Sequence, residues 1–319
     1  MARKLIIDAS NILYRTFFAH IKESLEVNVG MCHHMALSTI NKYFNSTKAD
    51  DVILAFDSYS WRKEYTKDLS TCVTYKKYKG TRRKDMSPSD REKMEKFDEH
   101  IEEFISLFRD MTRRVVLREK YLEADDLIAG YIQNNSEDEL ILISADKDFM
   151  QLLVRHNLKI IDPITDKERT LEKYNNDPDY FIFEKCIRGE SPSGDNVMSA
   201  YPRLRAKKIE EAYSDPLIRT NIMQNKFTQL VSDDAGNVEE VEFLTQDVFE
   251  ENKLLMDLSA QPDFIRDLID NTIDAAEENR GKFNYMEFLR FCGKYELNNI
   301  RERVDAYVPM LSCKRKGSY

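Results

Sequence analysis

The sequence predicts an α/β fold with a central, mostly parallel sheet flanked by helices, followed by a mainly helical C-terminal region. In the first half of the chain, short continuous apolar runs alternate with segments of helical periodicity. Such runs are typical of parallel strands covered on both faces, and their alternation with helices indicates a doubly wound sheet. After about residue 180 helices and loops dominate, so we divide the chain into 1–180 and 181–319.

The three strongest strand candidates share one property, which is an acidic residue close behind the last apolar position. The strands are residues 4–7, 52–56 and 140–144, and the acids are Asp8, Asp57, Asp146 and Asp148. Ligands of doubly wound sheets bind at the carboxyl ends of the strands, so we expect these acids to share one edge. Shorter strands are expected at 115–117 and 158–161.

Helical spacing of apolar residues predicts the segments that connect these strands. The expected helices are 11–20, 31–44, 89–113, 123–133 and 149–156, and the C-terminal region is expected to be helical over 249–304. In this interpretation Gly30 opens the second helix and Pro88 precedes the third.

A second group of acids stands at the start of the predicted helix 123–133. Glu123, Asp125 and Asp126 lie within four residues, and helix capping explains one or two of them but not three. Adjacent carboxylates repel one another unless a cation offsets them, and hard oxygen ligands suit Mg²⁺ or Mn²⁺. Two such ions roughly 3.5–4 Å apart can activate a water and stabilise the leaving oxygen of a phosphodiester. The acids therefore predict a metal-dependent nuclease.

Other kinds of site find little support. No Ser-His-Asp or Cys-His pattern is evident, and five scattered cysteines form no CxxC pair, so reduced thiols are expected. Cys32-His33-His34 is the one cluster to weigh as a zinc site, but it lacks a partner pair and fits a helix better. The short apolar runs exclude a membrane-spanning segment, and the first residues lack the apolar region of a signal peptide. We expect a cytoplasmic protein.

Charge is distributed unevenly. Residues 61–84 hold nine Lys or Arg and two acids, which gives +7 and leaves −16 for the rest of a chain whose net charge is −9. Within this segment tyrosines alternate with cations from Tyr75 to Lys84. Cations neutralise phosphates and tyrosines stack on bases, whereas the alternative is a solvated surface loop. Beside a carboxylate cluster we favour nucleic-acid binding.

These motifs together resemble the 5′ nuclease superfamily, which includes flap endonucleases, the 5′-nuclease domain of bacterial DNA polymerase I, and bacteriophage 5′→3′ exonucleases and RNase H. The resemblance covers residues 1 to about 200 and rests on 7–15, 55–57, 78–83, 123–126 and 144–153, which follow one another in the family's order. It implies a PIN-like catalytic domain over 1–180 with a helical arch at about 78–112, and two Mg²⁺ or Mn²⁺ ions.

The resemblance also implies roles for individual residues. The metal ligands, direct or through water, would be Asp8, Asp57, Glu123, Asp125, Asp126, Asp146 and Asp148. Lys79 and Arg82 would contact the scissile phosphate as catalytic residues. The other substrate-binding residues of this region would be Arg15, Lys76, Tyr78, Arg83 and Lys84.

The loop at 189–196 departs from the family's pattern. It is two residues longer than the usual Gly-Asp-x-x-Asp-Asn loop, but Asp195-Asn196 fits its end, so Asp195 would be the eighth ligand and Glu190 would replace the earlier Asp. The Gly-x-Gly expected next is absent, which puts a potassium-assisted backbone contact in doubt. Duplex binding by a helix–turn–helix element in 181–319 would instead depend on Arg203, Arg205, Lys207 and Lys208.

We therefore expect a structure-specific 5′→3′ exonuclease and flap endonuclease with RNase H activity, which removes RNA primers or 5′ flaps in DNA replication. Its substrates would be DNA with a 5′ flap or a single-stranded 5′ end and RNA–DNA hybrids, and a single-stranded-DNA-binding protein is a candidate partner. The compact length favours a monomeric bacteriophage enzyme in the host cytoplasm. The alternatives are a non-catalytic nucleic-acid-binding protein that retains the fold, or a metal-dependent phosphatase, which the +7 segment disfavours.

Overall fold

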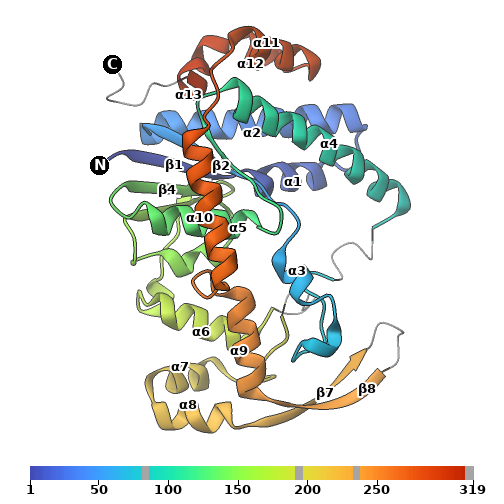
Figure 1. The fold of residues 1–319 in the computed structure, drawn as a ribbon, viewed down its shortest axis with the longest axis vertical. Helices are drawn as coiled ribbons and strands as arrows, with labels where there is room; N and C mark the ends of the chain where they lie inside the picture. The colour runs from blue at the N-terminus through green and yellow to red at the C-terminus, as the bar shows by residue number, and fades with distance from the viewer. Residues whose placement is uncertain (81–85, 191–196, 233–237, 313–319) are drawn as a thin grey trace.

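A six-stranded sheet forms the centre of the molecule in a computed structural model that describes residues 1–80, 86–190, 197–232 and 238–312 (Figure 1). The strand order is β3-β2-β1-β4-β5-β6, and every neighbouring pair is parallel except β5 and β6. The strands are β1 (Arg3–Asp8), β2 (Asp51–Ala55), β3 (Val115–Leu117), β4 (Glu139–Ile143), β5 (Leu158–Asp162) and β6 (Lys167–Glu168). This arrangement confirms the predicted α/β class and the strands on which it was based. The predicted site residues Arg82, Arg83, Lys84 and Asp195 lie outside the described residues.

Helices cover both faces of the sheet, because alternate side chains of the strands feed two separate cores. Leu5 and Ile7 of β1 face a core shared with α1, α2 and α4, whereas Ile6 faces a core shared with α5 and α10. The helices of the N-terminal half are α1 (Ala9–Ala19), α2 (Leu25–Thr47), α3 (Trp61–Tyr65), α4 (Pro88–Met111) and α5 (Ala124–Asn134). Short 3-10 helices are η1 (Leu69–Thr71), η2 (Asp148–Leu152), η3 (Glu172–Tyr174) and η4 (Val304–Ala306).

Two expected helices have different bounds. Helix α2 begins after Ser24, whose hydroxyl accepts a hydrogen bond from the Val27 amide, so Gly30 lies inside the helix and does not open it. A Cβ at Gly30 would lie 3.1 Å from the Tyr295 carbonyl oxygen, which suggests that close packing favours glycine there. The expected helix 149–156 is only the 3-10 turn η2, and Val154 beyond it has a φ of 71°.

The predicted change to helices and loops after residue 180 is only partly right. Helices α6 (Pro178–Arg188), α7 (Ala206–Ser214), α8 (Pro216–Met223) and α9 (Thr245–Met256) are present, but a β-hairpin separates α8 from α9. Its strands, β7 (Lys226–Ser232) and β8 (Val238–Leu244), pair antiparallel and project from the lower end of the molecule (Figure 1). Phe227 and Phe243 lie opposite each other in the pair and their rings stack.

The last helices return to the N-terminal half. They are α10 (Asp263–Glu278), α11 (Tyr285–Lys294), α12 (Asn298–Glu302) and α13 (Val308–Ser312), and α10 runs along the molecule from α9 to this end (Figure 1). Phe288, Ile300 and Leu311 belong to the same core as β1, α2 and α4. The predicted division at residue 180 therefore separates segments that pack together.

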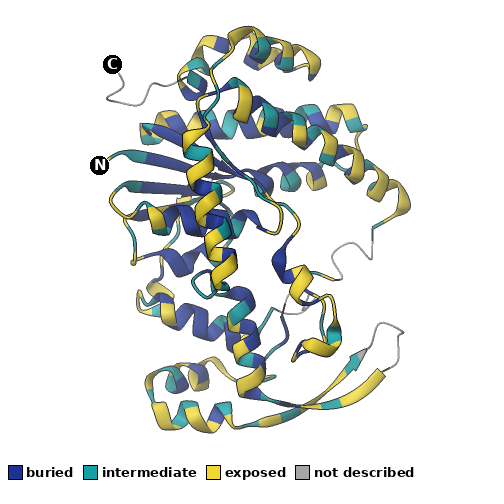
Figure 2. Ribbon diagram, viewed as in Figure 1, coloured by how far each residue is buried: buried dark blue, intermediate teal, exposed yellow. Residues whose placement is uncertain are grey.

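Burial follows this architecture. Buried residues concentrate in the sheet and on the helix faces turned towards it, whereas the hairpin and the outer side of α10 are largely exposed (Figure 2). Helix α4, expected in an arch, buries Phe97, Phe104 and Phe108 in the core beside α1 and α2. Within the described part of the chain, no helix has both the length and the apolar character needed to cross a bilayer.

Candidate active site

Asp8 lies at the carboxyl edge of the sheet, as predicted, between the ends of β2 and β4. It ends β1, caps α1 by accepting a hydrogen bond from the Asn11 amide (3.1 Å), and is 3% exposed. Its other oxygen accepts a hydrogen bond from the Ser144 hydroxyl at 2.7 Å. Burial, together with the nearby charges of Asp57 and Asp146, raises the pKa of Asp8 to about 7.

Asp57 connects the end of β2 to the second group of acids. Its carboxylate accepts a hydrogen bond from the Ala124 amide at 2.9 Å, and its own amide donates to the Ser10 hydroxyl at 2.8 Å. The first contact brings the start of α5, with Glu123 and Asp125, to the edge of the sheet. Asp125 is half-buried, and its desolvation, with the charges of Asp146, Asp8 and Glu123, raises its pKa well above the ordinary value.

The acids after β4 are held by a short chain of hydrogen bonds. The Asp146 amide donates to the Ser144 hydroxyl (3.0 Å), and the Asp148 amide donates to the Asp146 carboxylate (2.8 Å). Burial and the charge of Asp148 raise the pKa of Asp146. Lys185 of α6 pairs with Asp148 and lies 3.7 Å from Glu190, so a lysine that the sequence analysis did not single out joins this side of the site.

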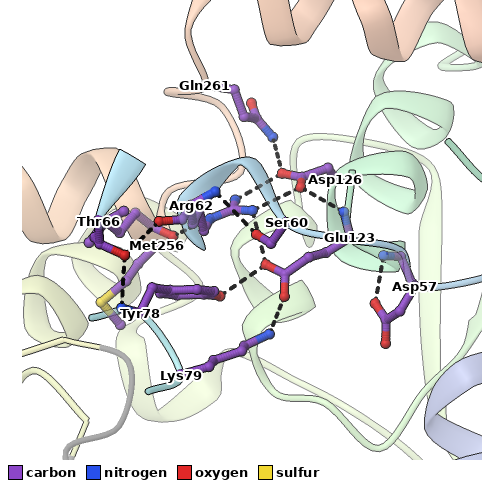
Figure 3. Close-up of polar contacts among 12 residues, drawn as sticks. Asp57, Ser60, Arg62, Thr66, Tyr78, Lys79, Glu123, Asp126, Met256 and Gln261 are labelled. Carbon is purple, nitrogen blue, oxygen red and sulfur yellow. Dashed lines mark hydrogen bonds and ion pairs between the residues drawn. The ribbon is translucent and has the colours of Figure 1, made fainter. Parts of the chain in front are cut away.

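Glu123 and Asp126 are bound to a buried arginine, Arg62 of α3 (Figure 3). Arg62 is 2% exposed and donates to both oxygens of Asp126 at 2.8 Å, to Glu123 at 3.2 Å and to the Leu255 carbonyl at 2.7 Å. Asp126 also accepts from the Glu123 amide (3.2 Å) and the Gln261 side chain (3.3 Å). Its carboxylate therefore takes four hydrogen bonds, an arrangement that fits a supporting residue better than a metal ligand.

The basic segment, residues 61–84, contacts the acidic residues at Glu123. The Tyr78 hydroxyl donates to Glu123 at 3.0 Å, and Lys79 forms an ion pair with its other oxygen (Figure 3). Burial alone would raise the pKa of Glu123, but the charges of Lys79 and Arg62 lower it to about 2. Glu123 is thus an anion at neutral pH, and it holds Lys79 at the site.

The structure places the remaining predicted residues around this centre. Arg15 of α1 is half-buried, and its Nη1 atom has no hydrogen-bond partner among the described residues. Lys76 is half-buried in the basic segment. Arg203, Arg205, Lys207 and Lys208 are exposed in the loop before α7 and in its first turn, and Lys208 pairs with Glu211.

The acids lie at the same edge of the sheet without forming a preassembled metal-binding cluster. Among residues 1–80, 86–190, 197–232 and 238–312, no three His, Cys, Asp or Glu side chains stand close enough together to hold one ion. Burial, followed by the charges of neighbouring acids, nevertheless raises the pKa values of Asp8, Asp125 and Asp146. Buried or half-buried carboxyls that have acidic neighbours, and that offer only hard oxygen donors, fit a divalent cation.

Comparison with protein families identifies the family to which the chain belongs. A family model described as the N-terminal resolvase-like domain of 5′–3′ exonucleases matches residues 3–178, more than half of the chain. The chain belongs to this 5′–3′ exonuclease family. Membership confirms the predicted superfamily and the prediction that the protein is a nuclease, that is, a phosphodiesterase. No curated protein sequence matched the chain.

Solved structures show the same fold over most of the chain. A bacteriophage T5 5′-exonuclease with bound zinc ions aligns with a TM-score of 0.61 at 20% identity, covering 86% of this chain and 100% of that one. The bacteriophage T5 flap endonuclease in a pseudo-enzyme–product complex with DNA and metal ions aligns with a TM-score of 0.58, again at 20% identity, covering 86% and 99%. At this identity the likeness establishes a shared fold.

Proposed function

We propose that the chain is a divalent-metal-dependent, structure-specific 5′→3′ exonuclease and flap endonuclease with RNase H activity on RNA primers. The observation that carries the proposal is the convergence of Asp8, Asp125 and Asp146, which three separate elements bring to one edge of the sheet, where burial and neighbouring acids raise their pKa values. A site that only bound nucleic acid would gain nothing from buried acids facing a phosphate. The metal ions and DNA in the T5 structures support the same activity.

The acids that remain candidates for holding two Mg²⁺ or Mn²⁺ ions are those that do not have Arg62 on both carboxylate oxygens, as Asp126 has. They are Asp8, Asp57, Glu123, Asp125, Asp146 and Asp148, with Asp195 outside the described residues. Asp126 is proposed to position Glu123 through Arg62 instead. When bound, such ions supply activation of a water and stabilisation of a leaving oxygen.

The chain's own cations complete the proposed site. Lys79, paired with Glu123, stands where it can transfer its hydrogen bond to a scissile phosphate, and Arg82 is the predicted second contact. Lys185 lies on the opposite flank, beside Asp148. The exposed cations at the start of α7 and in the preceding loop, with Arg15, Lys76 and Tyr78, are proposed to bind the rest of the substrate by neutralising phosphates and stacking bases.

The direct test is cleavage of a 5′-labelled flap DNA and of an RNA–DNA duplex with and without Mg²⁺. We expect the wild-type chain to cut both substrates only with the metal, and Asp146→Asn plus Asp148→Asn to reduce cutting by roughly 10³-fold or more, since two acids of the proposed site are lost. Equal cleavage by the wild type and the double variant would refute the proposal. Cleavage of the flap but not of the hybrid would remove only its RNase H part.

A further inference from the structure

Residues 73–80 of the basic segment form no helix or strand, so contacts with other parts of the molecule fix their backbone. The Tyr78 amide donates to the Thr66 hydroxyl at 2.9 Å, and the Gly80 amide donates to the Lys77 carbonyl at 3.1 Å. Together with the contacts of Tyr78 and Lys79 to Glu123, these bonds hold the end of the segment that enters the candidate active site.

The other end of the segment is held from α9. The carboxylate of Glu251 accepts the amide of Val73 on one oxygen (2.8 Å) and the amide of Thr74 on the other (2.9 Å). Glu251 is 4% exposed, and the Tyr65 hydroxyl donates to it at 3.4 Å. A buried carboxylate with two amide donors is a strong, charge-assisted anchor. Tyr75, the next residue, packs its ring against Phe243 of β8.

Backbone geometry between the two anchors shows how closely the segment is determined. Tyr75 and Lys79 have φ angles of 51° and 54°, in the left-handed region that residues with a Cβ seldom adopt. Such conformations persist where the surroundings over-determine them. The stretch from Lys76 to Lys79 is therefore set by its ends, at Glu251 and at Glu123.

The next residue of α9, Asn252, likewise fixes backbone, but on the side of the candidate site where Lys185 and Glu190 lie. Asn252 is fully buried and donates its side-chain amide to the carbonyls of Cys186 (2.8 Å) and Met198 (2.7 Å). These carbonyls lie near the end of α6, after Lys185, and beyond the loop that contains Glu190. Consecutive residues of one helix thus hold the backbone on both sides of the candidate site.

We propose that Glu251 is a positioning residue for phosphodiester cleavage, which places Lys76–Lys79 over the acidic edge by fixing the backbone at Val73 and Thr74. The inference rests on the proposed function, because its test requires that the wild-type chain cleave a 5′-flap DNA. It makes α9, and with it the adjoining hairpin, part of the apparatus that sets the position of Lys79. Glu251 itself touches neither substrate nor the acids of the sheet edge.

The test compares Glu251→Gln with the wild type in single-turnover cleavage of a 5′-flap DNA and in hydrogen exchange. Glutamine keeps the shape but turns an NH₂ group towards one of the two amides, so that anchor is lost. We expect the saturating rate to fall roughly tenfold with KM changed less than about threefold, since a misplacement of about 1 Å costs up to about 100-fold. Amide exchange over 73–80 should accelerate while exchange in the sheet stays unchanged.

Two further variants keep the test decisive. Glu251→Asp preserves the charge but shortens the reach, so it should show the same rate loss if positioning matters and near wild-type rates if only charge does. Asp51→Asn removes another buried acid, one that holds Arg114 and Arg280 at the amino edge of the sheet, and should lower stability without changing the saturating rate. Unchanged rate or unchanged exchange in folded Glu251→Gln would overturn the inference. A wild type that does not cleave would instead count against the proposed function.

Discussion

At the scale of single residues, the chain places charge where the fold alone would not favour it. Asp8 is the clearest case, because its pKa of about 7 lies far above the ordinary value of 3.8. A carboxyl with a raised pKa resists ionisation in the folded state. Its contribution to stability is therefore complete below about pH 4 and is lost as the pH rises towards 7. Ionisation of Asp8 at neutral pH therefore lowers the free energy of unfolding of the metal-free protein.

We expect Asp8→Asn to stabilise the metal-free protein at pH 8 by up to about 4 kcal/mol, since each unit of pKa shift corresponds to about 1.4 kcal/mol. The gain should shrink towards pH 5, where Asp8 is mostly protonated. Urea unfolding in EDTA at both pH values measures it. Asp274→Asn, an exposed acid on α10, should show no such pH dependence. A gain of equal size at pH 5 and pH 8 would contradict the assignment.

The sequence was sufficient to predict the acids but not the residues that hold them. Asp8, Asp57 and Asp146 follow strands directly, so local pattern and strand order bring them together. Arg62 and Glu251 act on partners 193 and 178 residues away in the chain, Leu255 and Val73. No periodicity encodes such contacts, so Arg62 was counted only as part of the basic segment and Glu251 was not singled out.

At the scale of elements, α10 of the C-terminal half packs against α5, the helix that begins at the candidate site. Gly130 of α5 makes this packing possible, because a Cβ at this position would collide with the Ile269 side chain. From the sequence alone, Gly130 in the predicted helix 123–133 did not indicate that Ile269 packs against it. The hairpin was missed because neither strand alternates regularly between apolar and polar residues, and β8 carries three glutamates in seven residues.

We expect Gly130→Ala to destabilise the protein by about 1–3 kcal/mol, although alanine normally favours a helix by about 1 kcal/mol. The collision with Ile269 should outweigh the propensity. Combining the change with Ile269→Ala should cost less than the sum of the single changes, and a double-mutant cycle by thermal or urea unfolding measures that coupling. Strict additivity would show that the two helices do not touch there.

At the scale of the whole molecule, two buried arginines of the N-terminal half bind backbone carbonyls of the C-terminal half. Arg114, just before β3, donates to the carbonyls of Met310 (2.6 Å) and Pro309 (3.1 Å) and to Asp51 (2.9 Å). Arg62 joins α3 to the end of α9 in the same way. The match of the family model ends at residue 178, yet the core that supports it includes residues up to Leu311.

We expect Arg114→Met to lower the free energy of unfolding by on the order of 3 kcal/mol, because buried carbonyls lose their donors and Asp51 loses one of its two arginine partners. Cleavage rates below the melting transition should stay near wild type, since Arg114 lies at the amino edge of the sheet. The exposed neighbour Arg113 provides the matched control, and Arg113→Met should change stability by less than about 0.5 kcal/mol. Equal losses would contradict the role given to Arg114.

The clamp formed by Arg114 has a consequence for how the protein is made. Its guanidinium is enclosed by carbonyls that follow 195 and 196 residues later in the chain, and the core around α2 and α4 is completed by Phe288, Ile300 and Leu311. While the ribosome is still synthesising that stretch, the acids of the nuclease already exist, but the scaffold that aligns them lacks one wall. The core around α2 and α4 is thus completed only after residues 288–311 have been synthesised, so we expect a chain that stops before Phe288 to unfold more readily than the full chain.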